Sequence, residues 1–398
     1  MAFYRQLGNI PPKRHTQHRD ESGNLYYEEL MGEEGFSSDS SLLYHREIPS
    51  AIVDATVWEL RDQSTTPNHP LKPRHLKLHT LFPESTWNET DVVTGRRLIL
   101  GNADVRLSYV VAAAPSPLYR NAIGDEMVYI ESGEATVETV FGTLEACEGD
   151  YVLIPMSTTH RWIPKGDKPL RAYAIEANSH IVPPKRYLSR FGQLLENAPF
   201  CERDLHGPTA PMIAEGTDIE VLVKHRTSAG IVGTRMVYPT HPFDVVGWDG
   251  CLYPYTFNIS DYEPITGRVH QPPPAHQAFE GNNFVICNFV PRKVDYHPCR
   301  SPCRTTTRTS TRTRSCSTAA VTTRHARFRH RAGFDIDSSR RPRPRPTTRR
   351  VRAKHRRRVL RRAGVMVDTF RPLELGEGAL ACEDEAYAWS WAGRGPQQ

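Results

Sequence analysis

Residues 126–160 read EMVYIESGEATVETVFGTLEACEGDYVLIPMSTTH, and this stretch indicates the fold class. Short apolar runs in it alternate with polar residues, as half-buried strands do, and glycines separate the runs. Further along the chain the same pattern returns in LRAYAIEA, IEVLVKH, GIVGTRMVY and NNFVICNFVPR. Many short strands with tight turns predict an all-β sandwich or barrel. One helical piece is expected, in PPKRYLSRFGQLLENAPF.

The same stretch resembles the two cupin motifs, because Glu126 precedes Gly133 by seven residues and Gly149 leads through YVLI to His160. The resemblance implies a small β-barrel whose opposite walls point side chains at one spot. A metal-binding cupin has two His shortly before the Glu, whereas LYRNAIGD precedes Glu126 here. Glu126 and His160 are fewer than the three protein ligands usual for a catalytic metal. We therefore expect a structural barrel with a core His160, and we assign no metal ligand and no cofactor-binding residue.

The composition limits the classes of protein to which the chain can belong. The 398 residues suffice for two or three domains, and 38% hydrophobic content is lean but compatible with a packed core. We find no apolar run of the ~18 residues that a membrane-spanning helix needs. The opening residues MAFYRQLGNIPPKRHTQHRDESG contain no apolar segment typical of a signal peptide. Eight scattered cysteines do not suggest a disulfide framework, so we expect a protein of the reducing cytoplasm without a membrane partner.

The net charge of +6 conceals an uneven distribution. Residues 299–364 contain 21 Arg and one Lys against two Asp, which gives this segment +20. The rest of the chain therefore carries 6 − 20 = −14. The segment has almost no hydrophobic periodicity and cannot bury a useful core, so we expect it to be disordered. Normal composition returns at residue 365.

Long phrases outside that segment resemble homogentisate 1,2-dioxygenases of the bacterial type. They are YRQLGNIPPKRHTQ, NLYYEELMGEEGFSSDSSLLYH, GWDGCLYPYTFNISDYEPITGRVHQPPPAHQAFEGNNFVICNFVPRKVDYHP and VMVDTFRPLELGEGA. The resemblance implies an all-β fold of two cupin-like (double-stranded β-helix, or jelly-roll) domains. It implies an extradiol-type, non-haem Fe(II) enzyme that uses O2 to open the ring of homogentisate to maleylacetoacetate, in tyrosine and phenylalanine catabolism. It also implies a homo-oligomer.

The expected division of the chain follows from these two observations. Residues 1–240 form an amino-terminal β-rich domain, whose degenerate cupin covers about 105–180. Residues 241–298 begin the carboxy-terminal cupin domain, which the Arg-rich segment 299–364 disrupts. Residues 365–398 are the remainder of that domain.

The Arg-rich segment stands where the family's iron ligands are expected, downstream of VDYHP. Fe(II) oxygenases of this kind use two His and one carboxylate on one face of the metal. Codons for RTTTRTSTRTRS (304–315) can be chosen so that a shifted frame reads YYHSNVDPDEV, with a His, an Asn two residues on and a Glu five beyond. The other frame permits His-x-His-Gly-Pro-Gln-Pro-Gly over 342–358. We hypothesise two or three insertions or deletions in this part of the gene sequence.

Through the resemblance, His270 in GRVHQPPPAHQAF is the candidate acid/base on the substrate hydroxyl, with a loop histidine as the simpler interpretation and His276 as its rival. His297 with Cys299 and Cys303 suggests a replacement metal site. A shifted reading frame places cysteines by chance, however, so we do not expect these residues to bind a metal. Whether Phe257 or Tyr262 lines a substrate pocket stays open.

Three hypotheses follow for function. The gene product is an iron dioxygenase with a small aromatic substrate and O2. Alternatively, the chain as printed is a catalytically dead member that lacks its iron ligands. The third hypothesis is a non-enzymatic cupin whose segment 299–364 binds nucleic acid non-specifically through its charge.

Overall fold

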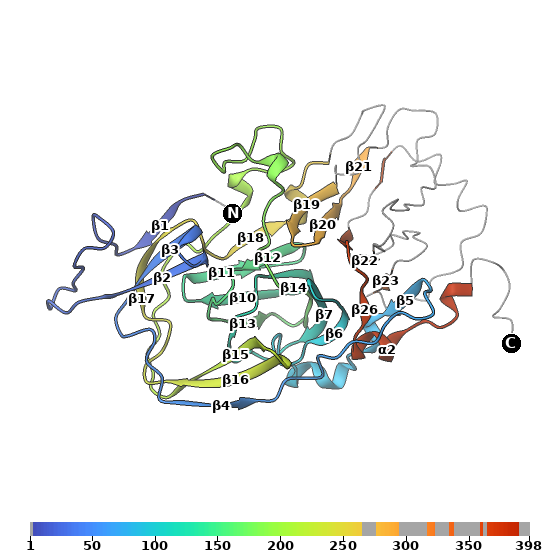
Figure 1. The fold of residues 1–398 in the computed structure, drawn as a ribbon, viewed down its shortest axis with the longest axis horizontal. Coiled ribbons are helices and arrows are strands. Elements are labelled where there is room, and N and C mark those ends of the chain that lie inside the picture. Colours follow the sequence, from blue (N-terminus) through green and yellow to red (C-terminus); the bar gives the residue numbers. More distant parts are fainter. Residues whose placement is uncertain are drawn as a thin grey trace.

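The structure, a computed structural model, describes residues 3–264, 276–293, 317–322, 334–337, 359–360 and 364–389. Two seven-stranded sheets pack face to face and form the amino-terminal barrel (Figure 1). The first consists, in spatial order, of β11 (Gly142–Ala146), β10 (Glu134–Thr139), β13 (His160–Lys165), β8 (Leu118–Asn121), β15 (Ile219–Thr227), β16 (Gly230–Tyr238) and β4 (Asp54–Trp58). The second consists of β18 (Tyr255–Asn258), β12 (Asp150–Ile154), β9 (Glu126–Ser132), β14 (Leu170–Ala177), β7 (Val105–Ala112), β6 (Arg97–Gly101) and β26 (Glu374–Leu375).

Three smaller sheets flank the barrel. A four-stranded sheet is made of β1 (Arg5–Gly8), β17 (Val245–Gly250), β3 (Ser37–His45) and β2 (Tyr27–Glu34). A six-stranded sheet is made of β19 (Gln277–Gly281), β20 (Phe284–Phe289), β25 (Gly364–Thr369), β22 (Ser317–Thr322), β23 (Phe334–Asp337) and β5 (Arg74–Lys77). The last pair is β21 (Arg292–Lys293) and β24 (Val359–Leu360).

Helices are short and few in the described part of the chain. They are α2 (Glu377–Cys382) and the 3-10 turns η1 (Leu78–Thr80), η2 (Glu84–Glu89), η3 (Lys185–Tyr187), η4 (Glu202–Asp204), η5 (Ile259–Asp261) and η7 (Tyr387–Trp389). The prediction of an all-β, cupin-like fold is confirmed. The helical piece expected within 183–200 is the single turn η3. Gly192 and Pro199 interrupt the helical pattern there, and Leu188 instead bridges to Leu194.

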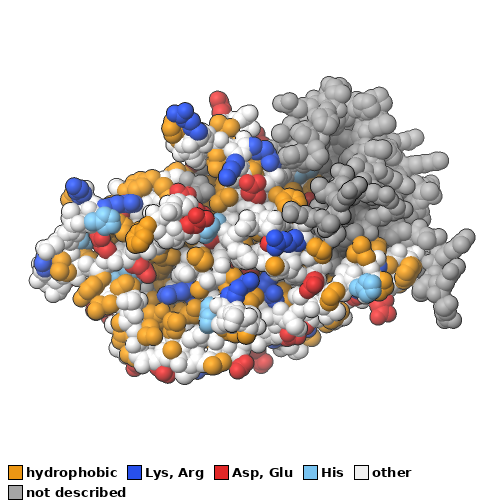
Figure 2. Space-filling model, viewed as in Figure 1, with side chains coloured by type: hydrophobic (Ala, Val, Ile, Leu, Met, Phe, Trp, Pro, Cys, Tyr) orange, Lys and Arg blue, Asp and Glu red, His pale blue; other side chains and the backbone are white. Residues whose placement is uncertain are grey.

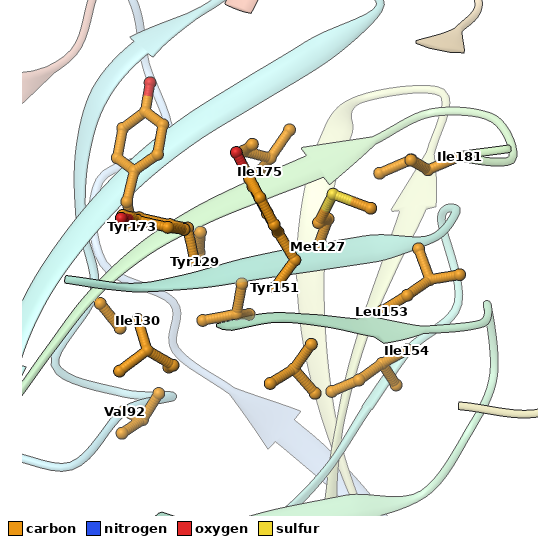
Figure 3. Close-up of a cluster of buried hydrophobic side chains, with 14 of the residues drawn as sticks. Val92, Met127, Tyr129, Ile130, Tyr151, Leu153, Ile154, Tyr173, Ile175 and Ile181 are labelled. Carbon is orange, nitrogen blue, oxygen red and sulfur yellow. The ribbon is translucent and has the colours of Figure 1, made fainter. Parts of the chain in front are cut away.

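The face of the second sheet that points away from the Glu126 side is apolar and aromatic. In Figure 3 the side chains of Met127, Tyr129, Tyr151 and Tyr173 project from neighbouring strands of the second sheet. All four are at most 2% exposed, and the rings of Tyr129 and Tyr151 lie 5.0 Å apart. Aromatic residues bury large areas, so this layer contributes to the stability of the packing on this face of the sheet.

Pairings join parts of the chain that the sequence assigns to separate domains. β17 and β18 follow the boundary expected at residue 240, yet β17 pairs with β1 and β3, and β18 pairs with β12. β26 pairs with β6, and α2 lies close to β5 and β6 (Figure 1). Arg97 on β6 forms an ion pair with Glu377 on α2. The carboxy-terminal residues are therefore anchored on the amino-terminal barrel.

The described surface mixes residue types. The face shown in Figure 2 carries apolar, acidic and basic side chains side by side, with several Lys and Arg near its middle. Within the described ranges no helix has the length and apolar character needed to cross a membrane. The five cysteines in those ranges are free thiols. The expected disruption of a second cupin by residues 299–364 falls mostly outside the described residues.

Candidate functional site

The two cupin-motif residues meet inside the barrel, together with two residues that the motif analysis left out. Glu126 opens β9 and His160 opens β13, which belong to opposite sheets. His160 is paired in register with Tyr119 on β8, and Asn121 lies two residues further along β8. All four side chains are at most 4% exposed. Because residues two apart on a strand share a face, Tyr119 and Asn121 both point into the barrel beside Glu126.

Both carboxylate oxygens of Glu126 are occupied by donors. Its Oε1 accepts hydrogen bonds from the Tyr119 hydroxyl (2.8 Å) and from Asn121 Nδ2 (3.0 Å). Its Oε2 accepts from Arg96 Nη1 at 3.0 Å. A buried carboxylate is costly unless it is paired and hydrogen-bonded, and this one has three donors.

A second carboxylate, Glu176, completes a network of four charges. Glu176 on β14 is paired in register with Glu126, so both point to the same side of the sheet. Its Oε1 accepts from Arg96 Nη1 (3.1 Å) and from Lys224 Nζ (2.8 Å). Burial alone would raise the pKa of Glu176, but the charges of Lys224 and Arg96 lower it below its ordinary value. Two cations and two carboxylates thus balance inside the barrel.

A tight turn delivers Arg96 to the barrel interior. Asp91 Oδ1 accepts hydrogen bonds from the backbone N–H of Val93 (2.7 Å) and of Thr94 (2.9 Å). Gly95 is required there, because a Cβ at that position would lie 2.5 Å from the Asp91 carbonyl oxygen. Arg96 Nε then donates to the carbonyl of Val92 at 2.9 Å, which fixes the guanidinium between the sheets.

His160 is fully buried, and burial favours its neutral form. Its Nδ1 lies 3.0 Å from the Thr158 carbonyl oxygen, and its Nε2 has no hydrogen-bond partner among the described residues. Burial lowers the pKa of His160, although the nearby Glu126 charge opposes this shift. The ring packs edge-on against Tyr119, with centroids 5.3 Å apart. The core histidine that the sequence predicts is therefore bonded on one nitrogen only.

A metal ion does not fit this arrangement. The spacing of Tyr119, Asn121 and Glu126 is that of the His, His and Glu of a metal-binding cupin, but neither Tyr119 nor Asn121 is free to bind a metal. The Arg96 guanidinium instead supplies the positive charge that Glu126 faces. In the described part of the chain, no group of three His, Cys, Asp or Glu side chains could hold a metal.

A second polar cluster lies in a hollow of about 30 Å³ at the junction with the four-stranded sheet. His45 on β3 contacts Asp244 through Nδ1 (2.6 Å) and Glu29 through Nε2 (3.1 Å). Burial would lower the pKa of His45, but the two carboxylates raise it to about 9. A hollow of this size holds only a few waters, so it has no room for a dihydroxyphenyl ring.

The remaining predicted residues are partly outside the described ranges. His270, His297, Cys299 and Cys303 lie outside them. His276 is described, and its ring stacks on Phe289 with centroids 4.5 Å apart.

Phe257 and Tyr262 belong to the core. They are 0% and 2% exposed, and both rings lie within 6.5 Å of the Phe200 ring.

Sequence reasoning missed Arg96, Glu176 and Lys224. No local motif surrounds them, because strand register in two sheets brings them together from distant parts of the chain. Tyr119 and Asn121 could have been found, since they stand at the two His positions of the first cupin motif.

Among solved structures, the chain matches a cupin-2 domain protein of Shewanella frigidimarina at 17% identity and a TM-score of 0.21, over 25% of this chain and 86% of that one. A cupin of Methanocaldococcus jannaschii with a double-stranded β-helix fold gives 16% identity and a TM-score of 0.21, over 24% of this chain and 85% of that one.

Sequence relatives are more specific. A protein of Saccharolobus solfataricus, provisionally classed as a dioxygenase, is 38% identical over 301 residues, 75% of each chain. Homogentisate 1,2-dioxygenase of Emericella nidulans is 23% identical over 64% of this chain and 58% of its own length. That of Bradyrhizobium diazoefficiens is 30% identical over 37% of this chain and 31% of its own length. A family model described as homogentisate 1,2-dioxygenase N-terminal matches residues 7–259, so the chain belongs to the homogentisate 1,2-dioxygenase family.

Proposed function

We propose that the gene encodes a dioxygenase that opens the ring of homogentisate with O2, in tyrosine and phenylalanine catabolism. The observation that carries the proposal is the family match over residues 7–259, extended by the family-like phrases of 247–298 and 365–379. In this proposal the amino-terminal barrel is a scaffold, because its cupin centre is filled by the Arg96 network. The chemistry then belongs to the carboxy-terminal cupin, in a cytoplasmic homo-oligomer.

When iron is bound, it supplies the reactivity toward O2. Fe(II) on two His and one carboxylate keeps positions open for O2 and for a chelating substrate. We propose that the codons for those ligands lie in shifted frames within residues 299–364. The lost His codons straddle Thr306/Thr307 and Pro344/Arg345, and the lost Glu codon straddles Thr313/Arg314. The chain as printed would then bind no iron at this place and would not turn over.

Sequencing the gene across codons 299–364 tests the proposal first. We expect a corrected reading frame that restores the codons for the two His ligands and the Glu ligand. The corrected and printed chains are then expressed side by side and compared for bound iron and for O2 uptake with homogentisate. We expect both signals from the corrected chain alone. An uninterrupted reading frame whose codons do not permit these ligands in any shifted frame would refute the frame hypothesis. O2 uptake by the printed chain with homogentisate would refute the claim that this chain is inactive.

His270 offers a matched pair of variants in the corrected chain. If His270 is the acid/base on the substrate hydroxyl, His270→Asn should lower kcat by about 10²- to 10⁴-fold. His276→Asn, six residues away in the same phrase, should leave kcat near its original value. Equal losses in the two variants would contradict the role proposed for His270.

A further inference from the structure

The β2–β3 hairpin meets the amino-terminal barrel at a histidine that lies between two carboxylates. His180 follows β14, and its Nδ1 is 3.6 Å from Asp125 Oδ1 and 3.7 Å from Glu33 Oε1. Asp125 directly precedes β9 of the barrel, whereas Glu33 lies near the end of β2. The exposed fractions of the three side chains are 21% for His180, 5% for Asp125 and 10% for Glu33. Water therefore screens these charges only weakly.

A β-bulge directs Glu33 towards the barrel. The register between β2 and β3 shifts between Gly32 and Glu34, so Glu33 is the extra residue of the bulge. Bulges of this kind change the direction in which a side chain points. Gly32 permits the tight geometry, because a Cβ at that position would lie 1.8 Å from the carbonyl oxygen of Gly35. The Glu33 carboxylate also accepts a hydrogen bond from Ser38 Oγ, which fixes it in this orientation.

Asp125 is held in place by the barrel. Its Oδ1 and Oδ2 accept hydrogen bonds from the backbone N–H groups of Met156 and Ile181, both at 2.9 Å. Its own backbone N–H donates to the carbonyl of Ser179 at 3.0 Å. The tip of the hairpin, residues 34–38, is exposed instead. The hairpin is therefore the element that can move relative to His180.

His180 is the cation that the two carboxylates share. Among the described residues, no other Lys, Arg or His forms an ion pair with Asp125 or Glu33. The contact with Asp125 raises the pKa of His180 above its ordinary value; burial opposes the rise, and the charges of Glu33 and Glu34 add to it. Once the ring is neutral, two largely buried carboxylates face each other without a cation, which is unfavourable.

The other titratable groups near this cluster do not replace the cation. Glu280 on β19 is acidic, and its Oε2 accepts a hydrogen bond from Gln277 Nε2 at 2.8 Å. Tyr255 on β18 is close enough to feel the Asp125 charge, but burial raises the pKa of its hydroxyl, so it stays neutral when His180 titrates.

We propose that His180 is a pH-dependent latch, whose protonated ring holds the β2–β3 hairpin against the barrel and whose deprotonation releases the hairpin. Because the pKa of His180 is raised in the folded chain, the latch is fully effective below pH 6.5 and is lost as the pH rises through the raised value. The latch involves neither iron nor ring opening, so it is independent of the proposed function.

Hydrogen–deuterium exchange of the full chain between pH 6 and 9.5 tests the latch. The measured quantity is the protection of residues 30–41, corrected for the intrinsic pH dependence of amide exchange. We expect this protection to fall by about 5- to 30-fold as the pH rises in the original chain. His180→Gln should show the low protection already at pH 6. Glu33→Gln should lose most of the pH dependence, and it keeps the test available if His180→Gln does not fold.

Two controls separate the latch from other titrations. His45 also contacts β2, through Glu29, and titrates in this range, but it is unchanged in the variants, so the difference from the original chain is the signal. His225→Gln replaces an imidazole that contacts Thr234 Oγ1 at 2.8 Å instead of a carboxylate, and it should leave the protection of 30–41 as it was. Equal protection of 30–41 in the original chain and His180→Gln at every pH would overturn the proposal, as would an unchanged pH dependence in Glu33→Gln.

Discussion

At the residue scale, Arg96 supplies the positive charge at the centre of the amino-terminal barrel, where a metal-binding cupin has a metal ion. Arg96 contacts Glu126 and Glu176 at 3.0 and 3.1 Å, and its guanidinium lies 5.7 Å from the centre of the Tyr119 ring. A guanidinium has several donors in a fixed plane, so it can bind two carboxylates at once.

Replacing Arg96 should destabilise the folded chain. In Arg96→Met, Glu126 remains buried without a positive partner, and we expect the free energy of unfolding to fall by about 3–5 kcal/mol. The double variant Arg96→Met/Glu126→Gln removes both charges and should recover part of this loss. Urea unfolding at pH 7 measures both values. If the double variant is as unstable as the single one, lost packing rather than an unpaired charge explains the effect.

His45 should make stability depend on pH. Its folded-state pKa of about 9 exceeds its ordinary value of 6.5, so the protonated ring is favoured in the folded chain. The contribution, about 3 kcal/mol, is fully present below pH 6.5 and is lost as the pH rises through 9. Glu29 on β2 and Asp244 before β17 supply the negative charge, and the Arg120 charge acts on Glu29.

The check is urea unfolding of the original chain and of His45→Gln between pH 6 and 9.5. Cysteines and tyrosines titrate in both chains, so the difference between the two curves isolates His45. We expect the difference to shrink as the pH rises. A constant difference across this range would show that the ring is not charged in the folded state.

At the element scale, a cluster of aromatic rings joins the barrel to the six-stranded sheet. Phe257 on β18, Phe279 on β19 and Phe200 lie with ring centroids 4.8–5.7 Å apart. Tyr151 on β12 contacts the same cluster, and its hydroxyl donates to Asn288 on β20 at 2.6 Å. These contacts connect sheets that share no backbone hydrogen bonds in the described residues.

Truncating the centre of this cluster should weaken the whole junction. Phe279 is 0% exposed, and Phe279→Ala is expected to lower the free energy of unfolding by about 3–5 kcal/mol. Phe191→Ala is the matched control, because Phe191 is 72% exposed and should change stability by no more than about 0.5 kcal/mol. Similar small losses in both variants would show that the cluster does not hold the sheets together.

At the scale of the whole molecule, charge is divided between two parts of the chain, with +20 on residues 299–364 and −14 on the rest. Such a segment attracts phosphate without reading sequence. We expect the printed chain to bind duplex DNA of any sequence at low salt and to lose about 10³-fold or more in affinity between about 50 and 200 mM salt.

Fluorescence anisotropy with two unrelated duplexes measures this dependence, and the control is a chain in which a Gly/Ser linker replaces residues 299–364, because residues 365–389 pair with the barrel and the six-stranded sheet. Binding that persists at physiological salt and distinguishes the duplexes would support the non-enzymatic, nucleic-acid-binding hypothesis instead.

The strands, the turns and the Glu126–His160 pair follow from local features of the amino-acid sequence. Alternation of apolar and polar residues is a local signal. A motif with fixed spacing can likewise be recognised from residues that lie close together in the sequence. Within 183–200 the helical piece that this reasoning predicts is one 3-10 turn, because prolines and a glycine interrupt the pattern.

The residues that fill the barrel interior are known from the three-dimensional fold alone. Arg96, Glu176 and Lys224 come from a turn and two strands of different sheets, and the turn and the strand register together bring their charges within 3.1 Å. The anchoring of β26 and α2 on β6 is equally non-local, since almost three hundred residues separate the partners. Long-range contacts of this kind leave no periodic signal in the sequence, because each partner is specified by the fold and not by its neighbours in the chain.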